Sequence, residues 1–228
     1  ERRLLSDGLK HAVVARRNAG MILSAMTREE GGVNLGQIQV YKRQVEEEII
    51  KICVAAKSIL QNHLIPSSNS AEDSVFYYTM VGDCYRYWAE FKIGEGKRLH
   101  ASHETSLALY ENATKIAEEE LHPANHTRLQ LALNFSVLFW DILFKYKRAY
   151  EMAQRAIQEG FSGMITLKGE SEKAASMDVL ELLRENVYLW TQILISEKLS
   201  VYKIDDGGEG SSSATAAKGG SDTTMLND

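Results

Sequence analysis

Apolar residues recur every three or four positions along most of the chain, which is the spacing of amphipathic helices rather than of strands. The stretch after residue 36 shows the pattern clearly, with apolar positions at Ile38, Tyr41, Val45, Ile49, Cys53, Ala56 and Leu60. Seven helices are predicted, at about residues 2–30, 36–63, 71–93, 100–121, 125–144, 147–160 and 171–203. Because their connections are short, we expect antiparallel helix pairs.

Helix-breaking residues fall between these segments rather than inside them. Two glycines at 31–32 end the first helix, and the segments 64–70 and 160–169 are predicted loops. The whole chain contains two prolines, Pro66 and Pro123. Few breakers and long stretches rich in Ala, Leu, Glu and Lys predict an all-α fold.

The fifth predicted helix and the two ends of the chain each differ from the amphipathic pattern of the rest. The fifth predicted helix is almost continuously apolar over 129–144, so we expect it to be central. From residue 205 the composition changes to Gly, Ser, Ala and Thr, which predicts a helical domain at 1–204 and a flexible tail at 205–228. The sequence starts at Glu1 inside a helical pattern, and we expect a further N-terminal segment to precede it.

Composition and charge limit the classes of function. The 228 residues are 44% hydrophobic and 25% charged, as in ordinary globular proteins, and the net charge is −5. The acidic balance and the lack of a basic run argue against a nucleic-acid surface, so an anion site must be a local basic pocket. Two dispersed cysteines, Cys53 and Cys84, make no disulfide framework, and no apolar run has membrane length. We therefore expect a cytoplasmic protein without membrane contact.

Candidate chemistry comes from cations and one amide on three predicted helices. Lys10 and Arg17 are seven residues apart, so on a helix they share a face about 10 Å apart. Arg86 and Tyr87 are adjacent on the third predicted helix, and Asn134 lies alone in an apolar run. Arginine offers a charged planar fork of donors that suits phosphate, and an amide can hold a ligand's backbone. We expect Arg86 to face a ligand rather than the core.

Each of these residues also has a structural interpretation. Taken singly, Arg17 is more often a solvated or salt-bridged residue, Tyr87 a core tyrosine, and Asn134 a satisfied buried amide. Asp83 and Glu90 could be general acids, but no nucleophile or second catalytic group accompanies them, so we expect no enzyme. No metal or cofactor site is predicted.

Several motifs in order carry a family resemblance that covers residues 1–192. They are ERRLLS at 1–6, ARR at 15–17, FYY at 76–78, GDCYRY at 82–87, RLQLALNFSV at 128–137, and LLREN at 182–186 with LWT at 189–191. Any one of them is a weak signal, whereas the ordered set is specific. The chain resembles the 14-3-3 family, a known instance of phospho-motif recognition by arginine clusters.

The resemblance implies an antiparallel helical array with a concave amphipathic groove. It implies a non-enzymatic adaptor that binds phosphoserine or phosphothreonine segments and clamps or masks the client protein. The residues expected at the phosphate are Lys10, Arg17, Arg86 and Tyr87. Asn134 and Asn186 are expected on the ligand backbone, and the groove wall and floor are expected to be Leu133, Val137, Asp178, Val179, Leu182 and Leu189. Asp83, one turn before Arg86, is expected to orient it.

The departures from the family keep a second hypothesis open. Thr79 stands where the family usually has a lysine, and Asp178 replaces an apolar wall residue. A divergent scaffold that binds partners without phosphate is therefore the alternative. The two N-terminal helices that relatives use to dimerise fall outside the given sequence, and Gln44 stands where relatives have a dimer-contact lysine, so for the chain as given we expect a monomer or weak dimer. A phosphorylated tail, for example at Ser221, could also be a tethered ligand.

Overall fold

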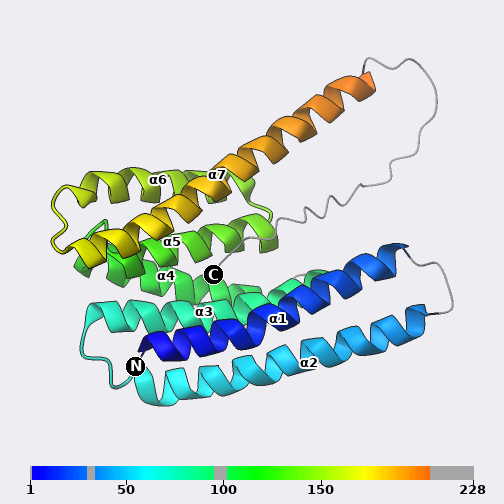
Figure 1. Cartoon of the computed structure of the whole chain (residues 1–228), viewed down its shortest axis with the longest axis horizontal. Helices are drawn as coiled ribbons and strands as arrows, with labels where there is room; N and C mark the ends of the chain where they lie inside the picture. Colours follow the sequence, from blue (N-terminus) through cyan, green and yellow to red (C-terminus); the bar gives the residue numbers. More distant parts are fainter. Residues whose placement is uncertain (1, 30–33, 95–101, 206–228) are drawn as a thin grey trace.

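The computed structural model describes residues 2–29, 34–94 and 102–205, and the secondary structure of this part of the chain consists of helices joined by short loops (Figure 1). Its α-helices are α1 (Arg2–Glu29), α2 (Leu35–Ile59), α3 (Ala71–Gly94), α4 (Ser102–Glu120), α5 (His126–Val137), α6 (Tyr146–Met164) and α7 (Glu170–Asp205). Two π-helical turns, Leu60–Leu64 after α2 and Leu138–Ile142 after α5, extend those helices without a break. The predicted all-α fold with seven helices is confirmed.

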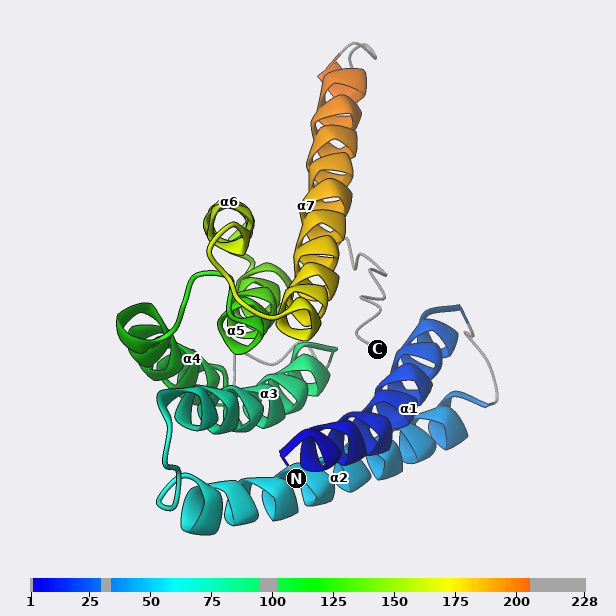
Figure 2. The same cartoon turned by 60° about the vertical axis from the view of Figure 1, so that its left-hand side comes forward.

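The helices form a cup with two walls. Packing is most extensive within the consecutive pairs α1–α2, α3–α4 and α6–α7, and α5 packs on α3, α4, α6 and α7. Figure 2 shows α1 and α2 on one side of the hollow and α7 on the other, with α3 and α5 between them. The predicted concave arrangement of antiparallel pairs follows from these contacts, and it makes α1, α3, α5 and α7 the lining helices.

Two apolar clusters hold the cup together. The larger surrounds α5, where Leu133 is 0% exposed, and it includes Trp140 stacked on Trp190 with ring centroids 4.6 Å apart. The smaller one lies between α1, α2 and α3 around Val13 and Ile49. The central position predicted for the fifth helix is therefore correct, and burial of its apolar side chains is the main stabilising term there.

The predicted end of the sixth helix is wrong. The sequence suggested a loop from Gly160, but α6 continues to Met164. Gly160 is buried, and a Cβ there would lie 2.8 Å from Cδ2 of Leu180 and 3.0 Å from Cδ2 of Leu129. This glycine lets α6 approach its neighbours, so packing rather than helix termination explains it.

Other predicted boundaries cannot be compared with the structure. The break at 31–32, the start of the fourth helix at 100 and the tail beyond residue 205 lie outside the described residues. Within them, Cys53 and Cys84 are free and buried. None of the described helices is both long and apolar enough to span a membrane.

Candidate functional site

Arg86 lies at the centre of a polar cluster on α3. Its guanidinium donates to Glu90 Oε1 at 3.0 Å and to Asp83 Oδ1 at 3.2 Å, and its Nε donates to the Tyr110 hydroxyl at 3.2 Å. Asp83 and Glu90 precede and follow Arg86 by one helical turn, so the same helix face presents all three side chains. The expectation that Asp83 orients Arg86 agrees with this contact.

Arg17 joins the cluster from α1. Its Nε and Nη2 donate to the two carboxylate oxygens of Glu90, at 2.7 and 2.9 Å, in a bidentate pair. Because Arg86 donates to the same carboxylate, one acidic side chain holds two guanidinium groups that are 69 positions apart in the sequence (86 − 17). The Arg17 side chain keeps 23% of its surface exposed, whereas that of Arg86 keeps 2%.

The Tyr87 ring lies against both arginines. The Cζ atom of Arg17 is 4.9 Å from its ring centroid and that of Arg86 is 4.6 Å away, so each cation faces the aromatic π-system. Three of the four residues expected at a phosphate are therefore adjacent. We call Arg17, Arg86, Tyr87 and Glu90 the arginine cluster.

The expectation that Arg86 faces a ligand rather than the core needs correction. At 2% exposure it is one of the largest fully buried side chains of the described structure, enclosed by Asp83, Glu90 and Tyr110. A buried charge is tolerated only with such partners. Arg17 is consequently the more accessible of the two arginines.

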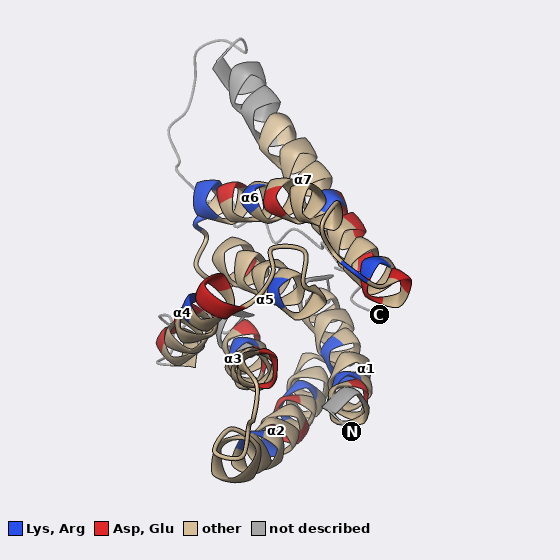
Figure 3. Cartoon of the chain, turned by 90° about the vertical axis from the view of Figure 1, so that its left-hand side faces the viewer, with Lys and Arg blue, Asp and Glu red and all other residues tan. Residues whose placement is uncertain are grey.

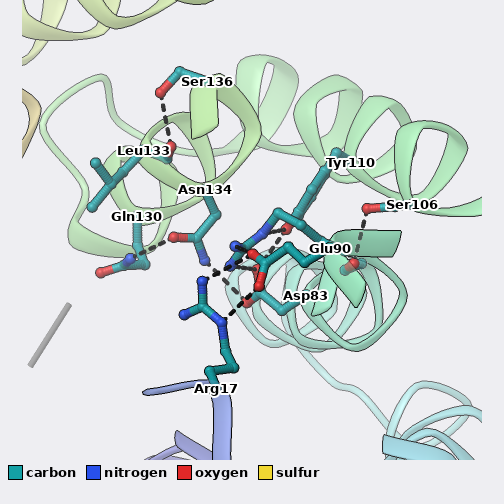
Figure 4. A network of polar contacts seen from close by, with 11 residues as sticks. Arg17, Asp83, Glu90, Ser106, Tyr110, Gln130, Leu133, Asn134 and Ser136 are labelled. Atoms are coloured by element: carbon teal, nitrogen blue, oxygen red, sulfur yellow. Dashed lines mark hydrogen bonds and ion pairs between the residues drawn. The ribbon is translucent and has the colours of Figure 1, made fainter. Parts of the chain in front are cut away.

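A chain of hydrogen bonds extends from the cluster to α4 and α5. The Tyr110 hydroxyl donates to Asp83 Oδ1, and Asn134 Nδ2 donates to Asp83 Oδ2 at 3.0 Å. Gln130 Nε2 in turn donates to Oδ1 of the Asn134 side chain at 3.0 Å. Asn134 is 5% exposed, and both of its polar atoms already have protein partners. The network therefore fixes the position of Asp83 from three helices (Figure 4).

Sequence reasoning missed Tyr110 and Gln130. Tyr110 reaches Arg86 because Gly82 lets the two helices approach: a Cβ at Gly82 would lie 2.8 Å from the tyrosine ring. Ser106 reinforces the approach by donating to the Gly82 carbonyl at 2.9 Å. Gly82 was visible in the sequence, but nothing in the spacing identifies the aromatic partner 24 to 28 residues later.

Burial and charge shift the acid–base properties of this region. Burial by itself would lower the pKa of Arg17, and the charge of Arg86 lowers it further, but the charge and hydrogen bond of Glu90 together with Tyr87 outweigh both, so the pKa is raised. In Arg86 burial acts the same way, and Tyr110, Tyr87, Asp83 and Glu90 together raise the pKa well above its ordinary value. Both guanidiniums therefore stay charged.

Asp141 responds in the opposite sense. It lies in the π-helical turn after α5, where burial and then the negative charge of Glu90 raise its pKa to about 7, against opposing effects of Arg86 and Arg17. Its charge can therefore change near neutral pH beside the arginine cluster.

A pocket of about 410 Å³ on the inner surface reaches Asp83, the carboxylate that pairs with Arg86, while its lining includes none of the four residues of the arginine cluster. Residues of α1, α3, α5 and α7 line it, including five expected site residues, Lys10, Asn134, Asp178, Val179 and Leu182. Its carboxylates are Asp7, Glu72, Asp83 and Asp178, so we call it the acidic pocket. Lys10 and Asp178 have no ion-pair partner among the residues that the structure describes.

The other predicted groove residues lie deeper or further along. Leu133 and Val137 are 0% and 3% exposed and pack in the core around α5. On α7, Asn186 is 5% exposed and Leu189 is 37% exposed. Neither pair lines the acidic pocket, and their contact with a ligand stays a prediction.

Similarity to known proteins agrees with this arrangement. The sequence matches the family described as 14-3-3 protein over residues 1–191. It is 41% identical over 228 residues to 14-3-3-like protein B of Vicia faba, covering 97% of this chain and 82% of that protein. It is 43% identical over 195 residues to the checkpoint signal transducer rad24 of Schizosaccharomyces pombe, covering 84% of this chain and 71% of that protein. The chain belongs to the 14-3-3 family.

Proposed function

We propose that the arginine cluster binds the phosphate of phosphoserine or phosphothreonine segments, and that the chain acts as an adaptor that clamps or masks phosphorylated client proteins. Membership of the 14-3-3 family supports a general role as a phosphoprotein-binding, non-enzymatic adaptor. The single observation that carries the finer proposal is the convergence of Arg17 and Arg86 on one carboxylate beside Tyr87.

The geometry suits a dianion because the cations are already assembled. Glu90 uses Nε and Nη2 of Arg17, while Nη1 makes none of the hydrogen bonds recorded among the described residues. A phosphate carrying a charge near −2 can bind there and compete with the single negative charge of Glu90. Hydrogen bonds to charged groups contribute roughly 1.5–3 kcal/mol each, so a few of them separate a phosphoserine from a serine by about a thousandfold.

Lys10, at the edge of the acidic pocket, supplies a further positive charge on the same helix as Arg17. Asn134 and Asn186 are proposed to hydrogen-bond the ligand backbone. For Asn134 this requires a spare amide hydrogen, because its Nδ2 already donates once to Asp83. Val179 and Leu182 of α7 then offer the apolar wall, with Leu189 further along the helix and Leu133 and Val137 beneath.

A phosphate-independent scaffold is the second candidate, and two observations favour it. Thr79 is 5% exposed and donates its hydroxyl to the Val75 carbonyl at 2.7 Å, so this position offers no cation to a phosphate. Asp178 places a carboxylate in the pocket beside the cluster. Both features weaken attraction for an anionic ligand without removing the two arginines.

A matched pair of peptides separates the two candidates. Each sequence is prepared with a phosphoserine and with a serine, and its binding to the full chain is measured by fluorescence anisotropy. Phosphate recognition predicts that the phosphorylated form binds at least a hundredfold more tightly, roughly 3 kcal/mol. Equal affinity of the two forms would favour the phosphate-independent scaffold. Recovery of unchanged phosphopeptide after incubation checks that the protein does not turn it over.

A further inference from the structure

A second hollow lies on the other side of the molecule, between α4 and α6. Both helices pack on α5 but hardly on each other, and a groove of about 1030 Å³ separates them. Figure 2 shows α4 and α6 apart, on the side of α5 away from α1. The residues that line this outer groove come from α4, α5, α6 and the segments that join them, and none comes from α1, α3 or α7. It is therefore separate from the arginine cluster and the acidic pocket.

The floor of the outer groove is apolar. Leu131 and Phe135 of α5 form its base and are 2% and 3% exposed, and the apolar surface that stays accessible comes from the half-buried Ala132, Met152 and Ala156. At one end Phe144 leaves 52% of its surface exposed, with φ at 52°, a backbone conformation that few bulky residues adopt. An exposed aromatic beside an apolar floor is the composition found at the centre of protein interfaces.

The two rims carry opposite charge. After the internal ion pairs Arg128–Glu159 and Lys147–Glu151 are set aside, the α4 rim presents three glutamates and one lysine. The α6 rim presents basic side chains from the segment 145–155. The acidic residues are Glu111, Glu118 and Glu119, and the basic ones are Lys145, Arg148 and Arg155. Figure 3 shows the charged positions of both helices.

We propose that the outer groove binds an amphipathic helix of a partner protein. The helix lays an apolar stripe on the floor, turns a basic edge to α4 and turns an acidic edge to α6. The lining residues of α6 run from 146 to 159, which at about 1.5 Å per residue is about 20 Å, or roughly four helical turns.

The shape of the occupant follows from the arrangement of the three surfaces. A helix has one apolar stripe with a polar edge on each side of it, which matches one floor between two rims. An extended strand alternates its side chains between two opposite faces, so it cannot meet both rims and the floor in this way. A small apolar molecule would fill the floor but leave the opposite charges of the rims unused.

The test uses two synthetic peptides of four helical turns with the same composition. Both carry a leucine stripe. In the first, lysines occupy one edge of the stripe and glutamates the other. In the second, lysines and glutamates alternate along both edges, so neither edge has a net charge. A simple exchange of the two edges would not serve, because a helix can reverse its direction in the groove. Binding to the full chain is measured by fluorescence anisotropy.

We expect the first peptide to bind about tenfold more tightly than the second, because several exposed charge pairs add modestly. The combined Glu118→Lys and Glu119→Lys substitutions should lower the affinity of the chain for the first peptide by about tenfold. Glu120→Lys is the matched control: Glu120 lies on the same helix and is exposed but does not line the groove, so it should change affinity by less than about twofold. Phosphopeptide binding at the arginine cluster should stay unchanged in both variants.

Three results would overturn the proposal. One is equal binding of the two peptides; another is unchanged affinity of the first peptide in the Glu118→Lys, Glu119→Lys variant. The third comes from sedimentation without peptide. If the natural chain self-associates and the Glu118→Lys, Glu119→Lys substitutions abolish this association, a second copy of the chain occupies the groove.

Discussion

The inner surface holds charge in two different ways. In the arginine cluster, Arg86 is 2% exposed and makes three hydrogen bonds, and Glu90 is shared by two guanidiniums. In the acidic pocket next to it, Lys10 and Asp178 have no ion-pair partner in the described part of the chain. Buried, fully bonded charges are held in place at a cost in desolvation, whereas exposed charges cost little and move freely. The cluster is therefore prepared for one kind of ligand group. In the pocket, Lys10 and Asp178 can vary without damage to the fold, whereas Asp83 cannot, because it pairs with Arg86.

The largest expected effect comes from removing the centre of the cluster. Arg86→Ala should weaken phosphopeptide binding by at least a hundredfold, roughly 3 kcal/mol, because the positive charge of Arg86 is lost and Glu90, the carboxylate that holds Arg17, loses a buried partner. It should also destabilise the fold by roughly 3–5 kcal/mol, since Asp83 and Glu90 lose a buried partner. Anisotropy and urea unfolding measure the two effects. Arg86→Lys keeps the positive charge but not the planar guanidinium, so its phosphopeptide affinity and its stability should both lie between those of the natural chain and of Arg86→Ala.

An unchanged dissociation constant in a folded Arg86→Ala protein would contradict the assignment of the cluster. Loss of stability alone, with the affinity of the folded fraction intact, would make Arg86 a purely structural residue.

The next effect concerns Asp141, whose pKa is about 7 in the folded protein against 3.8 as the ordinary value. The folded state then holds a proton that the unfolded chain has lost, so the stability from this group is present at low pH and falls as pH rises through about 7. Asp141→Asn removes this dependence. The unfolding free energy of the Asp141→Asn protein minus that of the natural chain should therefore increase by roughly 1–2 kcal/mol from pH 5.5 to pH 8. This figure is reduced to allow for the partial exposure of Asp141 to solvent. Urea unfolding of both proteins at pH 5.5 and pH 8 measures this difference. A difference that is the same at both pH values would show that the pKa of Asp141 is not raised.

Glu90→Gln tests the role of the carboxylate that occupies the two arginines in the absence of a ligand. The amide keeps the shape and one acceptor oxygen but not the negative charge that competes with phosphate. We expect phosphopeptide affinity to rise about fivefold at low salt, with a slightly smaller gain at high salt, because salt screens a partly buried carboxylate only weakly. Weaker binding instead would mean that Glu90 serves mainly to aim the two arginines.

The smallest effect is expected in the acidic pocket. Asp178→Leu should improve binding of phosphopeptides with apolar or acidic flanking residues by about threefold, because an exposed carboxylate on an otherwise apolar wall is removed. Glu181→Leu, an exposed change on the same helix outside the pocket, is the matched control. Equal gains in both variants across several flanking sequences would show that Asp178 does not face the ligand.

The sequence predicted what lies within one helix better than what lies between helices. Asp83, Arg86 and Glu90 follow helical spacing, so their proximity was readable from the chain. The pair Arg17–Glu90 spans 73 positions, and the bonds of Asp83 to Tyr110 and Asn134 span 27 and 51, so only the packing of α1, α3, α4 and α5 reveals them. Gly160 was misread for the same reason, because its role is set by Leu129 and Leu180 rather than by its neighbours in sequence.

The central claim is that Arg17 touches the phosphate, and a double-mutant cycle tests it most directly. Affinities are measured for the natural chain and for Arg17→Gln, each with the phosphorylated and the unphosphorylated peptide. If Arg17 binds the phosphate, the substitution should weaken the phosphorylated peptide by at least about tenfold more than its unphosphorylated partner. If Arg17→Gln weakens the binding of both peptides equally, the ratio of the two losses is one. That result would contradict a contact between Arg17 and the phosphate.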